Sequence, residues 1–392
     1  MSLQDINTSR ICQATTLVTN TDELKTLCEQ LSASRILAID TEFVRDKTYY
    51  PKLCLIQVAA DDVVACIDPL TIDDLSPLKD LLFNPAITKI FHAARQDMEI
   101  LYLTFGAVPT PVFDTQIAAT LLGLGEQIGY ANLVSQYLKT DVPKGHARAD
   151  WEQRPLSKEQ LEYAANDVRY LLQIYPMIID KLSSTGRIDW LAEDFAELGK
   201  EELYIPQPDE LWLRISGQQK LRGVQFAVLQ KLAAWRENIA KQKDKPRKWI
   251  LPDDLLITLS MQMPDKNQQL SRIRGLNSNI IDRYGDEILN VIARAKSLPE
   301  TEWPRPARRR KLSKQQEALI DAIMSIVKLQ AAQHEISTGA IASKSDLEKL
   351  VNGDRDISLL HGWRLGVAGQ QVLDFMDGKT TLHYKENKLL LE

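Results

Sequence analysis

The chain has 392 residues, of which 44% are hydrophobic and 26% charged, and its formal net charge is −5 at pH 7. This composition is ordinary for a globular protein of two or three domains and excludes a fibrous or largely disordered chain. No apolar run in the sequence approaches the ~20 residues that a membrane-spanning helix needs. The N-terminus lacks the basic and then apolar pattern of a secretion signal. The sequence therefore predicts a cytoplasmic protein with no membrane partner.

The first informative element is the apolar run from Ile36 to Ile39, which predicts a buried strand. Asp40 and Glu42 follow it directly. Side chains two apart in a strand point to the same side, so these two acids project together while Thr41 points elsewhere. Strand ends of open sheets favour ligand sites. Taken alone, however, the pair is more typical of a solvated strand exit.

A second strand-like run, residues 88–91, precedes a stretch with helical spacing from Ala94 to Phe105. Asp97 falls in the first turn of that predicted helix. A carboxylate at this position can serve as a metal ligand. It can equally be present because it interacts favourably with the helix dipole.

A longer helix is predicted from Ser157 to about Tyr175, with Ser157 as N-cap and Gln160 as its capping-box partner. Tyr163 and Asp167 are four residues apart and therefore share one face of this helix. A phenol and a carboxylate presented together suit a metal-dependent hydrolytic site. The structural alternative is a half-buried core aromatic beside an ordinary surface acid.

Taken in order, Asp40, Glu42, Asp97 and Asp167 resemble the four acids of the DEDD superfamily of 3′-5′ exonucleases, and Tyr163 matches its tyrosine subgroup. Residues 113–119 (FDTQIAA) and 148–156 (RADWEQRPL) look like the corresponding segments of bacterial ribonuclease D, and the resemblance covers nearly all of the chain. One local departure is the stretch 144–148 (KGHAR), where His146 reads as a loop residue.

This resemblance implies an α/β fold, with a ribonuclease-H-like exonuclease domain whose mixed sheet is flanked by helices. It implies that Asp40, Glu42, Asp97 and Asp167 hold two divalent metal ions, Mg²⁺ or Mn²⁺, and that Tyr163 orients the attacking water. The expected activity is 3′-5′ exoribonuclease trimming of structured RNA such as tRNA precursors, with release of nucleoside 5′-monophosphates. A DNA 3′-5′ exonuclease and a catalytically silent RNA-binding module remain open alternatives, and a monomer is favoured.

The predicted domains follow the proline-rich breaks in the chain. An exonuclease domain spans 1–205, and a helical segment, 208–297, resembles the HRDC domain of ribonuclease D and RecQ-type helicases. A basic linker, 298–312, leads to a second, more divergent HRDC-like helical domain at 313–392, whose end is either strand-like or a loosely held tail.

Charge is distributed unevenly between these parts. Residues 1–200 hold 18 basic and 28 acidic side chains, whereas the remainder holds 30 and 25. The appended helical part is therefore the better candidate for contacts with phosphate groups, although basic linkers are also common as plain solvated chain. The residues predicted to bind RNA are Lys144, Arg148, Arg154, Lys245, Arg247, Lys248, Arg308, Arg309 and Arg310.

Two other motifs do not support a further activity. Gly378-Lys379-Thr380 lacks the glycine that a phosphate-binding loop requires at position 373, which is Leu, so no nucleotide cofactor is expected. The five histidines are dispersed and never pair with cysteine at the spacing of zinc ligands.

Overall fold

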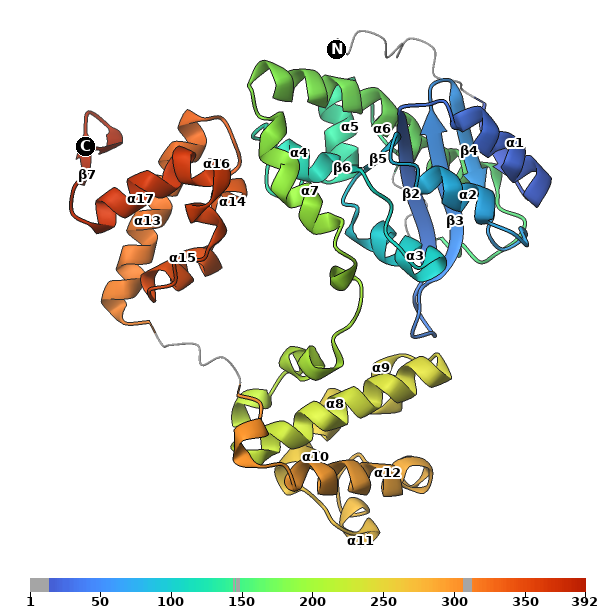
Figure 1. Cartoon of the computed structure of the whole chain (residues 1–392), viewed down its shortest axis with the longest axis vertical. Coiled ribbons are helices and arrows are strands. Elements are labelled where there is room, and N and C mark those ends of the chain that lie inside the picture. The colour runs from blue at the N-terminus through green and yellow to red at the C-terminus, as the bar shows by residue number, and fades with distance from the viewer. Residues whose placement is uncertain (1–13, 144, 146–148, 306–311) are drawn as a thin grey trace. The chain divides into compact units, whose positions relative to one another are not determined.

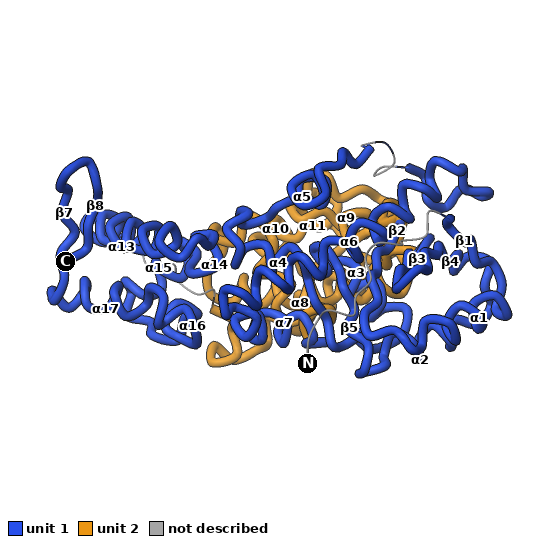
Figure 2. Tube along the Cα trace, turned by 90° about the horizontal axis from the view of Figure 1, so that it is seen from above, with its two compact units in different colours: residues 1–43, 53–201, 310–392 blue, residues 44–52, 202–309 orange. Residues whose placement is uncertain are grey.

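The computed structural model describes residues 14–143, 145, 149–305 and 312–392. The chain forms two compact units, shown in different colours in Figure 2. Unit 1 comprises residues 1–43, 53–201 and 310–392, and unit 2 comprises residues 44–52 and 202–309. This grouping is coarser than the predicted domain boundaries, which stay a prediction.

The N-terminal part of unit 1 is built on a six-stranded sheet in the order β1-β4-β3-β2-β5-β6. Strand pairs β1–β4, β2–β5 and β5–β6 are parallel, whereas β3–β4 is antiparallel. The sheet is therefore mixed, and Figure 1 shows helices lying along it. Both features confirm the fold class predicted from the sequence. The strands are β1 (Thr16–Val18), β2 (Ile36–Val44), β3 (Lys52–Ala60), β4 (Val63–Ile67), β5 (Thr88–Phe91) and β6 (Val112–Asp114).

The longest helix of this part, α6 (Lys158–Ser184), packs on the sheet through a buried apolar stripe. It begins as predicted, with Ser157 as N-cap and Gln160 completing a capping box. It continues past Pro176, beyond the predicted end, because Ile178 and Leu182 extend the buried stripe by two more turns. The other helices are α1 (Thr21–Leu31), α2 (Ser76–Leu82), α3 (Arg95–Phe105), α4 (Thr115–Thr120), α5 (Tyr130–Leu138) and α7 (Ala192–Leu198).

The C-terminal segment of unit 1 has its own apolar core and is held to the rest of the unit by specific contacts. The rings of Trp190 and Trp363 stack with centroids 4.5 Å apart, and Arg364 pairs with Asp194 at 3.0 Å. The backbone N–H of Ser337 donates to the carbonyl of Thr120. The elements are α13 (Lys314–Gln333), α14 (Thr338–Ile341), α15 (Lys344–Val351), α16 (Gly362–Arg364), a π-helical turn (Leu365–Gly369), α17 (Gln370–Met376), β7 (Leu382–Lys385) and β8 (Lys388–Leu391).

Unit 2 is a helical bundle around α8 (Val224–Lys243), and it also includes the loop between β2 and β3. The backbone N–H groups of Tyr49 and Tyr50 both donate to Asp244 Oδ1, at 3.0 and 3.2 Å, and the Tyr49 hydroxyl donates to Glu237. Loop 44–52 is thus fixed at the end of α8. The other helices are α9 (Arg247–Ile250), α10 (Asp253–Gln262), α11 (Asn267–Leu270) and α12 (Ser278–Lys296). Short 3₁₀ turns at Glu201–Leu203, Pro208–Arg214 and Gln218–Lys220 precede α8 in the chain.

Candidate active site

Strands β2 and β5 bring three of the predicted acids to one edge of the sheet. The two strands are parallel, with Ile36 opposite Thr88 and Ala38 opposite Ile90. Asp40 and Glu42 lie in the last part of β2. Strand β5 ends at Phe91, and α3 begins four residues later with Asp97 in its first turn. Because the carboxyl ends of parallel strands meet at the same edge, Asp97 arrives beside the β2 acids.

Helix α6 supplies Asp167 and Tyr163 from the same face, as their spacing predicts. The backbone of α6 is tied down at this point by Tyr130 from α5. Its buried hydroxyl donates to the carbonyl oxygens of Asn166 at 2.8 Å and Asp167 at 2.5 Å. The position of Asp167 is therefore set by a contact with its own main chain as well as by the helix.

The carboxylates of Asp40, Glu42 and Asp167 each offer an oxygen, and these three oxygens lie within 4.8 Å of one another. Asp97 is not part of this triplet, but it is only 6% exposed and lies close enough for the charge of Asp40 to raise its pKa. Thr41 Oγ1 donates to Asp97 Oδ1 at 2.5 Å. The structure thus gathers three of the four predicted ligands and places the fourth next to them.

Burial and mutual repulsion raise the pKa of every one of these carboxyl groups. Desolvation is the main cause for all four. The pKa of Glu42 rises to about 10, with further contributions from Asp40, Asp167 and Asp97. The pKa of Asp167 rises to about 7, because of burial and the charge of Asp97. Hard divalent cations prefer oxygen ligands, so four crowded carboxyl groups of this kind suit a site for such cations.

The half-buried phenol of Tyr163 lies within electrostatic reach of the same cluster. Desolvation and the charges of Asp167, Glu42 and Asp40 raise the pKa of its hydroxyl above the ordinary value of a tyrosine. The hydroxyl therefore keeps its proton at neutral pH, where it can both donate and accept a hydrogen bond.

Asp114 is a residue of the site that sequence reasoning missed. Its carboxylate caps α4 by accepting from the N–H of Gln116 at 2.7 Å. It also accepts from the N–H groups of Ala93 and Ala94, at 3.1 and 2.8 Å, in the turn that leads into α3. Ala93 adopts a left-handed conformation with φ of 60°, so this turn needs such support. Asp114 therefore fixes the helix that carries Asp97.

Two further residues missed by sequence reasoning are Thr41 and Tyr130, which hold Asp97 and the Asp167 backbone. Family resemblance alone singles out the segment containing Asp114, and strand alternation gives no reason to connect Thr41 with Asp97. No local pattern marks a tyrosine whose hydroxyl reaches a carbonyl 37 residues away.

Of the residues predicted to bind RNA, Arg154 is instead engaged inside the protein. Five hydrogen bonds join its guanidinium to Asp68 and to the carbonyl oxygens of Cys54, Trp151 and Gln153. Since a guanidinium has five N–H donors, none is left for a phosphate, and the RNA contact predicted for Arg154 is not retained.

The other residues predicted to bind RNA fall into two groups, those that the structure describes and those that lie outside the described residues. Arg247 pairs with Glu237 and lies over the ring of Tyr49, whereas Lys245 and Lys248 are exposed. Five lie outside the described residues: Lys144, Arg148, Arg308, Arg309 and Arg310.

Comparison with protein-family models agrees with this architecture. Residues 15–183 match the model described as 3′-5′ exonuclease, and residues 225–292 match the HRDC domain. Together with the mixed sheet and its acidic cluster, these matches define a 3′-5′ exonuclease with an appended helical HRDC region, a class that uses divalent metal ions. The second HRDC-like domain predicted at 313–392 stays a prediction.

The relatives narrow the class further. The chain is 37% identical over 369 residues to ribonuclease D of Gluconacetobacter diazotrophicus, covering 93% of this chain and 94% of that protein. It is 38% identical over 380 residues to ribonuclease D of Zymomonas mobilis, covering 96% and 97%. The crystal structure of Escherichia coli RNase D, an exoribonuclease involved in structured RNA processing, matches with a TM-score of 0.83 and 32% identity over 93% of this chain and 99% of that one. The chain belongs to the ribonuclease D family of 3′-5′ exoribonucleases.

In the part of the chain that the structure describes, no helix has the length and apolarity needed to span a bilayer.

Proposed function

We propose that this protein trims the 3′ ends of structured RNAs such as tRNA precursors by a two-metal mechanism, releasing nucleoside 5′-monophosphates. In this proposal Asp40, Glu42, Asp97 and Asp167 hold two divalent ions, Mg²⁺ or Mn²⁺, and Tyr163 orients the attacking water. We expect the protein to act as a cytoplasmic monomer.

The observation that carries the proposal is the convergence of the Asp40, Glu42 and Asp167 oxygens within 4.8 Å of one another. These three residues come from a strand and a helix more than a hundred positions apart, so their proximity is a product of the tertiary fold. Among the described residues, no lysine or arginine lowers the pKa of these carboxyl groups by supplying a compensating positive charge. A pair of divalent ions supplies that charge when bound, and stabilises the attacking and leaving oxygens of an in-line displacement.

The remaining steps fall to the side chains themselves. Tyr163 keeps its proton at neutral pH, so its hydroxyl can donate to the scissile phosphate or accept from the attacking water. The Thr41 hydroxyl donates to one oxygen of Asp97 at 2.5 Å and so fixes that carboxylate beside the cluster. Because α6 presents Tyr163 one turn before Asp167, the water-orienting group and a metal ligand keep a fixed separation.

A metal-titrated cleavage assay tests this function. The substrate is a tRNA precursor with extra 3′ nucleotides, labelled at its 5′ end so that stepwise shortening is visible, while the products are identified as nucleoside 5′-monophosphates. We expect cleavage with Mg²⁺ or Mn²⁺ and none with EDTA. Preference for single-stranded DNA would favour the DNA exonuclease instead. RNA binding without cleavage at any metal concentration would favour the silent binding module.

The variants Asp40→Asn and Asp167→Asn should abolish cleavage while leaving RNA binding measurable, because each removes a charged ligand at nearly constant volume. Asp62→Asn is the matched control, since Asp62 is exposed on the turn between β3 and β4. Full activity in either site variant would overturn the metal assignment. Tyr163→Phe should lower turnover without changing the melting temperature.

We also propose that unit 2 captures RNA through a groove of about 800 Å³ beside α9 and α12. Lys243, Lys245 and Arg283 line it together with Trp249, whose side chain is 61% exposed. An exposed indole among cations is suited to stack on an unpaired base while the cations contact phosphates. Lys248 neighbours this groove in sequence and is exposed too.

If this groove captures RNA, substitutions in it should weaken RNA binding and leave the rate of the chemical step unchanged. Trp249→Ala and Lys245→Glu should each raise the KM for the tRNA precursor and leave kcat unchanged. Lys266→Glu makes the same charge change at an exposed position outside the groove and serves as the control. An equal rise in KM for the control variant would show that only net charge matters and would remove the groove from the proposal.

A further inference from the structure

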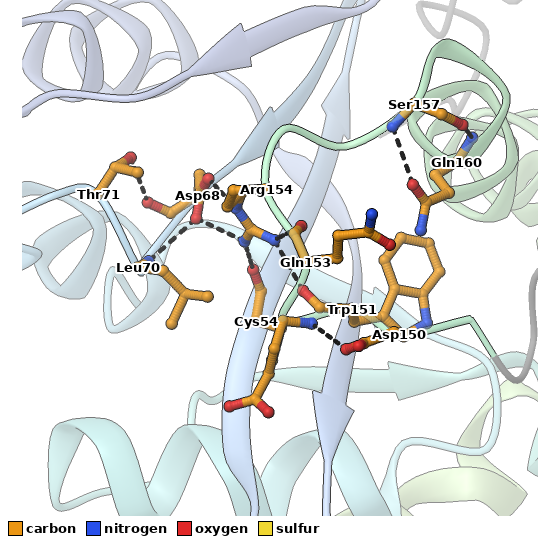
Figure 3. Close-up of polar contacts among 11 residues, drawn as sticks. Cys54, Asp68, Leu70, Thr71, Asp150, Trp151, Gln153, Arg154, Ser157 and Gln160 are labelled. Atoms are coloured by element: carbon orange, nitrogen blue, oxygen red, sulfur yellow. Dashed lines mark hydrogen bonds and ion pairs between the residues drawn. The ribbon is translucent and has the colours of Figure 1, made fainter.

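The side chain of Arg154 joins the segment between residues 150 and 155, just before α6, to the sheet. Figure 3 shows Arg154 reaching Asp68 and Cys54. Its Nε and one terminal nitrogen donate to the two oxygens of Asp68, at 2.5 and 2.7 Å. The second proton of that nitrogen goes to the Cys54 carbonyl at 2.7 Å. The other terminal nitrogen donates back to the carbonyls of Trp151 and Gln153, at 2.7 and 2.8 Å.

The acceptor side of this clamp is rigid. Asp68 directly follows β4 and is 2% exposed. Its Oδ1 also accepts from the N–H of Leu70 at 3.0 Å, and its own N–H donates to the carbonyl of Val18 in the neighbouring β1. Cys54 lies in β3. A bidentate arginine–carboxylate pair fixes orientation as well as distance. The guanidinium therefore holds the chain around Trp151 at a fixed position relative to the sheet.

The side chain that this clamp positions is the indole of Trp151. It is 2% exposed, and its ring centroid lies 6.3 Å from that of Tyr163 at an angle of 34°. Among the described residues the indole Nε1 has no hydrogen-bond partner, so this ring contacts its neighbours by packing. The phenol of Tyr163 rotates about two side-chain bonds, and a fixed neighbour on its flank restricts that rotation.

From these contacts we infer that Trp151, locked in place by Arg154 and Asp68, is a positioning residue that holds the Tyr163 ring in its working orientation beside the carboxylate cluster. This inference rests on the proposed role of Tyr163 in orienting the attacking water. It gives Arg154 a role in turnover in place of an RNA contact. The alternative is that Trp151 is a core residue that contributes only to folding.

A double-mutant cycle separates the two roles. Trp151→Leu should lower kcat by about tenfold to a hundredfold, the loss that small misplacements of catalytic groups produce, with the KM for the RNA unchanged. In a Tyr163→Phe background, the same substitution should lower kcat by less than about twofold, because the hydroxyl that it positions is already gone. An equal fold-loss in both backgrounds would overturn the inference and leave Trp151 as a core residue.

Two measurements guard against a trivial loss of structure. The Mn²⁺ dissociation constant of each variant reports whether the carboxylate cluster is intact and should stay at the wild-type value. Trp190→Leu removes another packed tryptophan of unit 1 and should leave kcat unchanged. If Trp151→Leu does not fold, Trp151→Phe is carried through the same cycle, since it keeps an aromatic ring but not its full contact with Tyr163.

The clamp itself is tested with Arg154→Lys. Lysine preserves the charge opposite Asp68 but cannot reach Asp68, Cys54 and Trp151 in the same geometry. We expect a lower melting temperature, because part of the five hydrogen bonds is lost, and a loss of kcat, measured well below that temperature, that again disappears in the Tyr163→Phe background. If the wild type does not degrade RNA, or Tyr163→Phe turns over at the full rate, the proposed function fails. If both of those hold and the losses are additive, only the positioning role fails.

Discussion

Removing the hydroxyl of Tyr130 is the sharpest test of how the site is held together. This group donates to the carbonyl oxygens of Asn166 and Asp167 at 2.8 and 2.5 Å, and it touches no atom of the carboxylate side chains in any hydrogen bond between described residues. Tyr130→Phe therefore leaves every predicted ligand in place. It removes only the tie between α5 and the turn of α6 that carries Asp167.

The size of the effect follows from these contacts. One proton is shared between two acceptors, so the loss counts as a single buried hydrogen bond of about 1.5 kcal/mol in unfolding free energy. For a domain of this size that corresponds to a fall in melting temperature of about 3–6 °C. Partners that orient a metal ligand typically change metal affinity by about tenfold or more when removed. We expect the Mn²⁺ dissociation constant to rise by about tenfold for the same reason.

Calorimetry with and without Mn²⁺ measures both quantities on the same samples. Tyr137→Phe is the matched control, because Tyr137 lies on the same helix and its hydroxyl makes no hydrogen bond among the described residues. Both the melting temperature and the Mn²⁺ affinity of the control should equal those of the wild type. If Tyr130→Phe binds Mn²⁺ as tightly as the control does, the tie does not position Asp167 and the reasoning is refuted.

Three further predictions concern the surroundings of the site. Asp114→Ala should lower the unfolding free energy by about 2 kcal/mol, since a helix cap and the turn before α3 lose their acceptor, and urea unfolding measures it. Lys89→Met should cost about 2–4 kcal/mol by the same measurement, because the ammonium donates to the carbonyl oxygens of Asn84, Ile87 and Thr110 at 2.9, 2.6 and 2.7 Å and leaves them unpaired. The raised pKa values of the site acids mean that the folded protein binds more protons than the unfolded chain above about pH 4. The melting temperature in EDTA should therefore fall between pH 5 and pH 8, and saturating Mg²⁺ should remove most of that fall; a pH-independent melting temperature in EDTA would contradict the raised pKa of Asp167, about 7.

What could be predicted from the sequence is what local geometry dictates. The pairing of Asp40 with Glu42 follows from strand alternation, and that of Tyr163 with Asp167 follows from helical spacing. The capping box that starts α6 is visible as Ser157 and Gln160. Each depends on residues about one helical turn or a few strand positions apart. Such relations hold whatever the rest of the chain does.

What could not be predicted depends on contacts between distant segments. Arg154 looks like a phosphate-binding residue in a polar stretch, but its partner Asp68 is 86 positions away in the sequence. Thr41 belongs to the face opposite Asp40 in a regular strand, yet it reaches Asp97 from 56 positions away. In both cases the identity of the partner is fixed only when the sheet is assembled. A sequence pattern gives the residue type but not the acceptor that satisfies it.

The groups that hold the site do so without neutralising it. Thr41, Tyr130, Asp114 and Arg154 act on backbone groups, on one carboxylate oxygen or on an acid outside the cluster. Among the described residues, no lysine or arginine contributes to lowering the pKa of Asp40, Glu42, Asp97 or Asp167. A nearby arginine would make the acids easier to bury, but it would also occupy the oxygens that a metal ion needs. The fold instead crowds these carboxyl groups together without a cation, and when they ionise to bind a metal, their combined negative charge favours divalent over monovalent cations at this site.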